Sequence, residues 1–304
     1  MAWTLPPRHL APTTRAALWV GFGGICATLM NVFIRVASKD LHPFEVTFFR
    51  CLFGLLVLVP WLMRIGLSTL RTNKIGFYTL RSAVSLISML SWFYGVTLVP
   101  LATATALNFT GPLFATAGAA LILGETVRLR RWMAVIVGFL GVLVIIRPGV
   151  GALDPNLLII LLSAATAGMG VVTVKYLSRS ESATAIVTYM VVYSAPLALI
   201  PALFVWRWPS LKALGAMAVL GMLGTTAHFA MVRAYSSADA SACAPFEFLR
   251  MPFTALLAFL VFGEVTDVWT WVGAAVIAGS SIYVAHREAR LARRAAPPAT
   301  QPGD

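Results

Sequence analysis

Apolar residues run along this chain in long blocks, and short polar segments separate them. Charged residues, often with proline or glycine beside them, mark the boundaries of the blocks. A block of about 20 residues is long enough for a helix to cross a bilayer core of about 30 Å. The pattern predicts an all-α integral membrane protein with ten transmembrane helices, at about residues 16–36, 44–63, 75–97, 101–123, 131–146, 155–176, 183–206, 211–234, 240–262 and 268–286.

The connections between the blocks are short, so successive helices are expected to run antiparallel. Residues 288–304 are basic at first and then rich in proline and alanine. That composition is typical of segments without fixed structure. We therefore expect a disordered tail after the tenth helix.

Composition supports a membrane protein. Of 304 residues, 59% are hydrophobic and 11% charged, whereas about a quarter of a soluble domain is charged. The net charge of +12 does not indicate a nucleic-acid partner, because the basic residues lie mostly in short segments between the apolar blocks. Cys26, Cys51 and Cys243 lie inside apolar blocks, which favours buried thiols over a disulfide framework.

The distribution of basic residues predicts the orientation. Sixteen of the 23 Lys and Arg residues lie at the two termini or in the even-numbered connections, six lie in the odd-numbered connections and their flanks, and Arg250 lies within a block. Basic residues accumulate on the cytoplasmic side of a membrane. We therefore expect both termini in the cytoplasm, with stronger support from residues 1–150 than from the second half.

One stretch of the chain is written twice. "NFTGPLFATAGAALILGE" at 108–125 and "EFLRMPFTALLAFLVFGE" at 247–264 share six of 18 positions, and the same offset places Trp132 on Trp271. Each half, 15–147 and 155–287, holds five predicted helices. Because five is odd, the second half enters the membrane the opposite way round, and such inverted repeats tend to bind substrate between the halves near the midplane.

Ten helices in two halves, with Gly-Glu closing the fourth and the ninth, resemble the drug/metabolite transporter superfamily in its EamA-domain branch. The resemblance covers about residues 15–287. Within that branch, the chain is similar to bacterial amino-acid and metabolite exporters. It implies a central cavity lined mainly by helices 1, 3, 4, 6, 8 and 9, with helices 5 and 10 at the periphery. Carriers of S-adenosylmethionine and riboflavin belong to the same broad group, so the substrate stays open.

The two copies differ where each begins. The first opens with neutral Asn108, whereas the second opens with Glu247 and adds Arg250 one helical turn later. Charged side chains at membrane depth must be paired or hydrated. Either Glu247 and Arg250 neutralise each other, or they line the cavity and bind a zwitterion, with Arg250 on the carboxylate and Glu247 on the ammonium.

Each copy also carries a proline, Pro112 in the first and Pro252 in the second. Proline removes a backbone donor and bends a helix. The two residues are therefore either hinges beside the cavity or simple kinks.

The third helix carries a stripe of polar and aromatic residues, Arg81, Ser85, Ser88 and Trp92, at spacings that share one helix face. This stripe either lines the cavity or bonds a neighbouring helix, and Arg81 could instead extend to the cytoplasmic surface.

His228 is expected at a depth similar to Glu247. It either lines the cavity, and could then relay protons with that carboxylate, or donates one hydrogen bond within the bundle.

Further candidates for substrate contact are Asn31, Met169 and Phe246. The segment "AGMGVV" at 167–172 favours close helix packing more than binding. Glu125 and Glu264 close helices at ends where the macrodipole disfavours an anion, so we expect structural clamps.

Several chemistries have no sequence support. The chain has no phosphate-binding loop, no metal-ligand spacing and no nucleophile elbow. We expect no cofactor or metal and no enzyme activity, with a small-molecule substrate, surrounding lipid and no nucleic-acid partner; the oligomeric state is not predicted.

The sequence thus predicts a secondary transporter in the bacterial inner membrane that works by alternating access. It moves amino acids or related small amphiphilic metabolites, and the resemblance favours export. The alternatives are uptake of S-adenosylmethionine or another nucleoside-like metabolite and, in another class, a non-transporting membrane enzyme.

Overall fold

A computed structural model of the chain describes residues 12–65, 75–124, 129–147, 154–177, 183–237 and 240–295. All regular secondary structure in these ranges is helical. The helices are α1 (Pro12–Ala37), α2 (Pro43–Ile65), α3 (Ile75–Leu98), α4 (Leu101–Asn108), α5 (Gly111–Leu123), α6 (Leu129–Ile146), α7 (Asn156–Leu177), α8 (Ala183–Leu203), α9 (Leu211–Tyr235), α10 (Ala240–Glu247), α11 (Arg250–Phe262) and α12 (Val268–Ala295).

These helices match the ten predicted blocks, because α4 with α5 forms the fourth block and α10 with α11 forms the ninth. Length and composition alone suit five stretches for crossing a membrane: α1 from Thr14, α4–α5, α7 up to Val174, α9, and α10–α11 from Pro245. The described ranges thus show an all-helical fold whose helices correspond to the ten predicted spans, five of which are long and apolar enough to cross a membrane. One boundary differs, since α12 continues through residues 288–295, where a disordered tail was predicted; residues 296–304 lie outside the described ranges.

The fourth and ninth spans are broken rather than gently bent. The ring of a proline clashes with the carbonyl four residues earlier. For Pro112 that residue is Asn108, the last of α4, and for Pro252 it is Phe248, directly after α10. The chain tightens at the first break, where the amides of Phe109 and Thr110 donate to carbonyls three residues back, at 3.3 and 3.1 Å. Each proline then lies in the first turn of the next helix, where its missing amide costs little.

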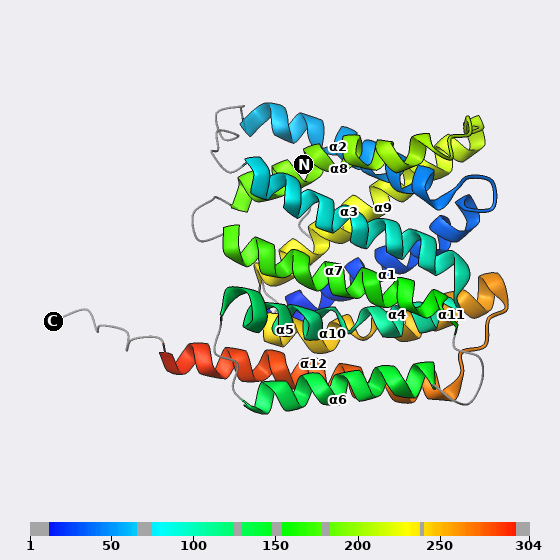
Figure 1. The fold of residues 1–304 in the computed structure, drawn as a ribbon. Helices are drawn as coiled ribbons and strands as arrows, with labels where there is room; N and C mark the ends of the chain where they lie inside the picture. The colour runs from blue at the N-terminus through cyan, green and yellow to red at the C-terminus, as the bar shows by residue number, and fades with distance from the viewer. Residues whose placement is uncertain are drawn as a thin grey trace.

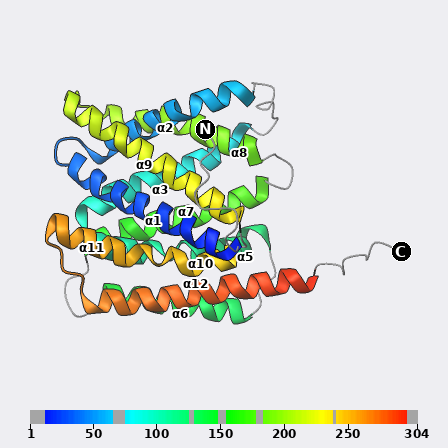
Figure 2. The same cartoon turned by 180° about the vertical axis from the view of Figure 1, so that it is seen from behind.

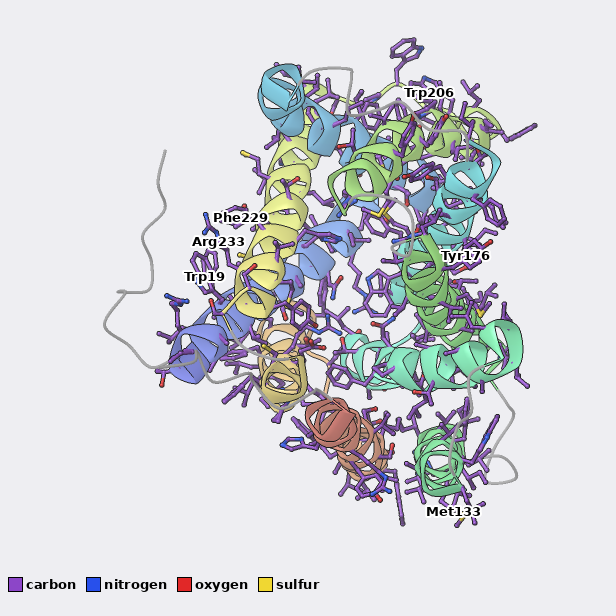
Figure 3. All side chains as sticks on the ribbon, turned by 90° about the vertical axis from the view of Figure 1, so that its left-hand side faces the viewer. Trp19, Met133, Tyr176, Trp206, Phe229 and Arg233 are labelled. Carbon is purple, nitrogen blue, oxygen red and sulfur yellow. The ribbon has the colours of Figure 1, made fainter. Side chains whose placement is uncertain are left out.

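The two halves pack through exchanged pairs of helices. α1 lies beside α9 and α3 beside α7, so the first span of each half contacts the third span of the other. α2 pairs with α8 at one edge of the molecule, and α6 pairs with α12 at the opposite edge (Figures 1 and 2). The end-on view of Figure 3 shows the remaining helices arranged between these edge pairs. The peripheral place of the fifth and tenth spans agrees with the implication of the resemblance.

The repeat is also visible in the helix ends. Gly124 after α5 and Gly263 after α11 both adopt left-handed backbone conformations, with φ of 64° and 70°. Both glycines cap their helices at positions 139 residues apart by the offset of the sequence repeat. The opposite orientation of the second half stays a prediction, as do the domain limits at 15–147 and 155–287.

Small residues allow the closest approach of helices. A Cβ at Gly168 of α7 would lie 2.7 Å from the Ala115 nitrogen and the Gly111 oxygen of α5. The backbones of these helices therefore touch at a residue that only glycine fits. This contact explains Gly168 of segment 167–172 as a packing residue.

Candidate functional site

The breaks of the two discontinuous spans meet inside the bundle. Phe109 follows α4 and Phe248 follows α10, and their rings pack edge to face with centroids 4.5 Å apart. These two residues are equivalent by the repeat offset. Their contact brings the ends of α4 and α10, with Asn108 and Glu247, to the same region of the molecule.

Arg250 begins α11 at this meeting point. Its guanidinium lies over the ring of Phe109, 5.2 Å from the centroid, and Gly24 of α1 packs against its Cβ. Its Nε atom is buried and has no hydrogen-bond partner. A guanidinium carries five donors, so Arg250 keeps capacity to bind an oxygen ligand.

Glu247 and Arg250 do not form a salt bridge with each other among the described residues. The Glu247 carboxylate instead accepts a hydrogen bond of 2.5 Å from the Tyr235 hydroxyl at the end of α9. Both candidates for zwitterion binding therefore lie near the breaks, with the acid held by a neutral donor.

Two predicted residues of α1 and α3 are joined directly. Asn31 is 2% exposed, and its Oδ1 atom accepts a hydrogen bond of 3.1 Å from Trp92 Nε1. The indole is half-buried and lies in the middle of the bundle between these helices. This bond fixes the orientation of the aromatic ring.

The rest of the α3 stripe divides between two environments. Arg81 donates to Ser85 Oγ and to the Met190 thioether, at 3.6 Å, and its Nε is buried without a partner. Its NH1 atom also lies against Gly170 of α7. Ser88 and Ser163, by contrast, exchange hydrogen bonds with each other's carbonyls at 2.9 and 2.8 Å, so Ser88 joins α3 to α7.

His228 is exposed on α9, and the hydrogen bond to the Glu247 carboxylate comes from Tyr235 rather than from His228. The charged side chain that acts electrostatically on His228 is Arg50 of α2. Arg50 NH1 contacts the Met89 thioether at 3.5 Å, and its guanidinium would lie 3.0 Å from a Cβ at Gly224. Sequence reasoning missed Arg50 by counting it with the connections; its isolation inside an apolar block is the signal that marks it.

The other candidates pack within the bundle. Met169 lies against Gly118 of α5, at 3.0 Å from a Cβ placed there, and Phe246 packs against a cluster that includes Trp19 of α1. Asn108 is half-buried, and both hinge candidates, Pro112 and Pro252, are exposed. The exposure of the two prolines agrees both with hinges beside the cavity and with simple kinks.

A second polar centre joins the two halves away from the breaks. Arg35 of α1 donates to Glu264 at 2.5 Å and to the carbonyls of Val96 and Val99 at 2.5 and 2.6 Å. The other Glu264 oxygen accepts from the Leu101 amide at 2.9 Å. The base that compensates Glu264 thus comes from the other half of the chain, which local sequence could not reveal. Glu125 lies outside the described residues.

The described residues contain no group of three metal-ligating side chains. One hollow of about 610 Å³ lies between residues 38–43 and 203–207, and a groove of about 350 Å³ lies between α6 and α12. Neither is lined by a predicted substrate residue, so the central cavity stays a prediction.

Comparison with known proteins places these features in a family context. The sequence profile of the EamA-like transporter family matches residues 14–147 and again 155–285. The chain is 31% identical to an S-adenosylmethionine uptake transporter of Rickettsia prowazekii, over 89% of this chain and 92% of the relative. It is 30% identical to a riboflavin transporter of Vibrio cholerae, over 92% and 96%. It is 28% identical to the pseudopaline exporter CntI of Pseudomonas aeruginosa, over 82% and 88%.

One solved crystal structure has the same fold. It superposes with a TM-score of 0.59, covers 91% of this chain and 99% of its own, and is 18% identical. Similarity at that identity supports the architecture and carries no information on substrate.

Proposed function

Since this chain belongs to the EamA-like transporter family, we propose that it carries an amino acid or a related small amphiphilic metabolite across the bacterial inner membrane. The chain is a multi-pass bacterial membrane transporter of the drug/metabolite superfamily. The substrate, the direction of transport and the cytoplasmic position of both termini belong to the proposal.

The observation that supports this substrate class is the pair of opposite charges at the helix breaks. Arg250 has an unused donor, and Glu247 is held by the single hydroxyl of Tyr235. A carboxylate on Arg250 would gain a charge-assisted hydrogen bond, and an ammonium on Glu247 would gain another. An α-amino-acid group supplies both.

The broken spans give this site a means of moving. Discontinuous helices with a substrate between inverted halves are a recurring basis for alternating access. The two halves would rock about the contact of Phe109 with Phe248, and the segments near Pro112 and Pro252 would absorb the bend. The direction is export, as in the exporters that the sequence resembles.

Uptake of S-adenosylmethionine is the second candidate, because relatives of this name are similar over most of both chains. S-adenosylmethionine carries the same α-amino-acid group together with an adenine ring. The ring could stack on the phenylalanine pair at the breaks. Relatives named for riboflavin and for pseudopaline are also about 30% identical to this chain, so sequence identity at this level does not select one substrate.

The test is transport by the purified protein in vesicles. Labelled amino acids and labelled S-adenosylmethionine are offered singly and in competition, with and without a pH gradient. We expect Glu247→Gln and Arg250→Met to reduce transport about 10- to 100-fold, because each would lose a charge-assisted bond worth about 1.5–3 kcal/mol.

Arg233→Met is the matched control, because Arg233 also lies in a span but stacks on Phe229 at the outer side of α9 (Figure 3). It should transport normally. Normal rates in both site variants would overturn the zwitterion site. Vesicles that convert a substrate chemically without moving it would support a membrane enzyme instead.

A further inference from the structure

Two arginines at the ends of the bundle have carboxylate partners. Arg35 binds Glu264 and Arg147 binds Asp267. Inside, Arg50, Arg81 and Arg250 have no carboxylate within salt-bridge distance among the described residues. Their partners are two thioethers, one hydroxyl, one aromatic ring and, for Arg50, the thiol of Cys51.

These partners are too weak to balance a half-buried cation. A thioether is a weak acceptor, and a serine hydroxyl carries no net charge. Burying an arginine without an anion costs several kcal/mol unless water or a ligand reaches it. The buried Nε atoms of Arg81 and Arg250 have no acceptor at all. An anion that reached these atoms would complete their hydrogen bonding.

The three arginines lie at different depths. α2 and α3 are consecutive helices that begin at opposite ends of the bundle. At 1.5 Å per residue, Arg50 is about 10 Å from the start of α2, and Arg81 is about 9 Å from the start of α3. Arg250 lies between them at the break of the ninth span. Positive charge thus extends from one half of the membrane thickness to the other.

The charge is not balanced within this region. Between the depths of Arg50 and Arg81 the described residues place one carboxylate, Glu247, against three guanidinium groups. Glu45 lies nearer the start of α2 and accepts hydrogen bonds from the amides of His42 and Arg207. His228, which is exposed on α9, adds no negative charge. Any substrate that passes here meets an excess of positive charge.

We propose that Arg50, Arg250 and Arg81 form a ladder of anion-binding groups, and that the substrate of this carrier is a metabolite with carboxylate charge in excess of cationic charge. This inference rests on the proposed transport function and narrows it. It disfavours S-adenosylmethionine, whose sulfonium and ammonium outnumber its single carboxylate. Arg50 and Arg81 are then specificity-determining residues that act with Arg250.

The first experiment compares compounds that differ mainly in charge. Glutamate, glutamine and lysine share the α-amino-acid group, and S-adenosylhomocysteine differs from S-adenosylmethionine by the methyl that creates the sulfonium. We expect glutamate to have a lower half-saturation concentration for transport than glutamine or lysine, and S-adenosylhomocysteine a lower one than S-adenosylmethionine. Each difference should be at least about tenfold, the ratio that one additional charge-assisted bond provides. Equal or better transport of the cationic members would overturn the ladder.

Variants connect this preference to the arginines. Arg50→Gln and Arg81→Gln should each reduce the glutamate-to-lysine ratio about tenfold, whereas Arg50→Lys keeps the charge and should retain most of it. Arg233→Gln, outside the bundle interior, should leave the ratio unchanged (Figure 3). Unchanged ratios in both glutamine variants would contradict the inference.

A second measurement separates failure of the ladder from failure of the proposed function. Glutarate has two carboxylates and no amino group, so it tests anion binding without requiring an amino-acid substrate. It should raise the thermal midpoint of the purified protein and of Arg233→Gln, but not of Arg50→Gln or Arg81→Gln. Transport of amino acids regardless of charge, with no glutarate effect, would remove the ladder and keep the carrier. A glutarate effect without amino-acid transport would keep the ladder and remove the proposed substrate.

Discussion

Asn31 and Trp92 show how a single hydrogen bond can orient a residue of the site. The amide oxygen of Asn31 is buried and accepts the indole proton from the facing helix. Leaving a buried donor without its partner costs about 1–3 kcal/mol, whereas removing both partners can be nearly neutral. The bond therefore contributes to stability mainly because breaking it would leave the Trp92 N–H or the Asn31 amide oxygen buried without a partner.

This predicts a non-additive pair of variants. Asn31→Leu should lower the thermal midpoint of the purified protein by several degrees, because the Trp92 N–H loses its acceptor. Trp92→Phe should have its own cost from lost ring area. The double variant should be more stable than the sum of the single effects, by about 1 kcal/mol of coupling. Strict additivity of the midpoints would show that the bond contributes nothing.

Single residues were predicted from the sequence to different degrees. Glu247 and Arg250 stand out because they are charges inside an apolar block, and the structure brings them to the helix breaks. Arg50 was assigned to a connection, because the edge of a block does not reveal how far inside a residue lies. The acceptor of Arg35 was also hidden, since Glu264 is 229 positions away in sequence.

Helices meet most closely where side chains are absent. Gly168 of α7 lies against the backbone of α5, and Gly141 and Gly273 bring α6 and α12 together, with a Cβ at either one within 2.9 Å of the other's carbonyl oxygen. The sequence predicted the ten spans and the close helix packing at the small residues of segment 167–172. It did not predict that the fourth and ninth spans break before their prolines, because a bend and a break share the same residues.

The packing at Gly168 is testable with a single methyl group. Gly168→Ala should destabilise the protein by about 1–3 kcal/mol, because the new Cβ meets backbone atoms that cannot move aside. Gly21→Ala is the matched control, since a Cβ on that residue of α1 has no neighbour within 4 Å. The comparison is between thermal midpoints in detergent. Equal midpoints for the two variants would mean that α5 and α7 can separate without cost.

At the scale of the whole molecule, two halves of one chain are held together by exchanged helix pairs and by a polar clamp. α1 packs on α9 and α3 on α7, while Arg35 of the first half binds Glu264 of the second. Sequence similarity predicted two equivalent halves, but the pairing between them depends on three-dimensional contacts that no local pattern encodes. A transporter that rocks its halves must break any bond that closes one side. The clamp, at the end of α1, is suited to keep that side closed.

Breaking the clamp should therefore open the interior at that end. We expect Glu264→Gln to increase labelling of an introduced Asn31→Cys, one turn of α1 from Arg35, by a membrane-impermeant thiol reagent applied outside the cell, where the proposed orientation places this end of α1. A carboxylate removed from a largely buried pair leaves Arg35 uncompensated at a cost of about 3–5 kcal/mol, which would shift the balance toward the open state. Asp267→Asn is the matched control, because its exposed pair with Arg147 also joins the halves but lies between the peripheral α6 and α12 and is worth about 0–1 kcal/mol. If both variants leave labelling at the level of the parent protein, the bond between Arg35 and Glu264 serves stability alone and the halves separate elsewhere.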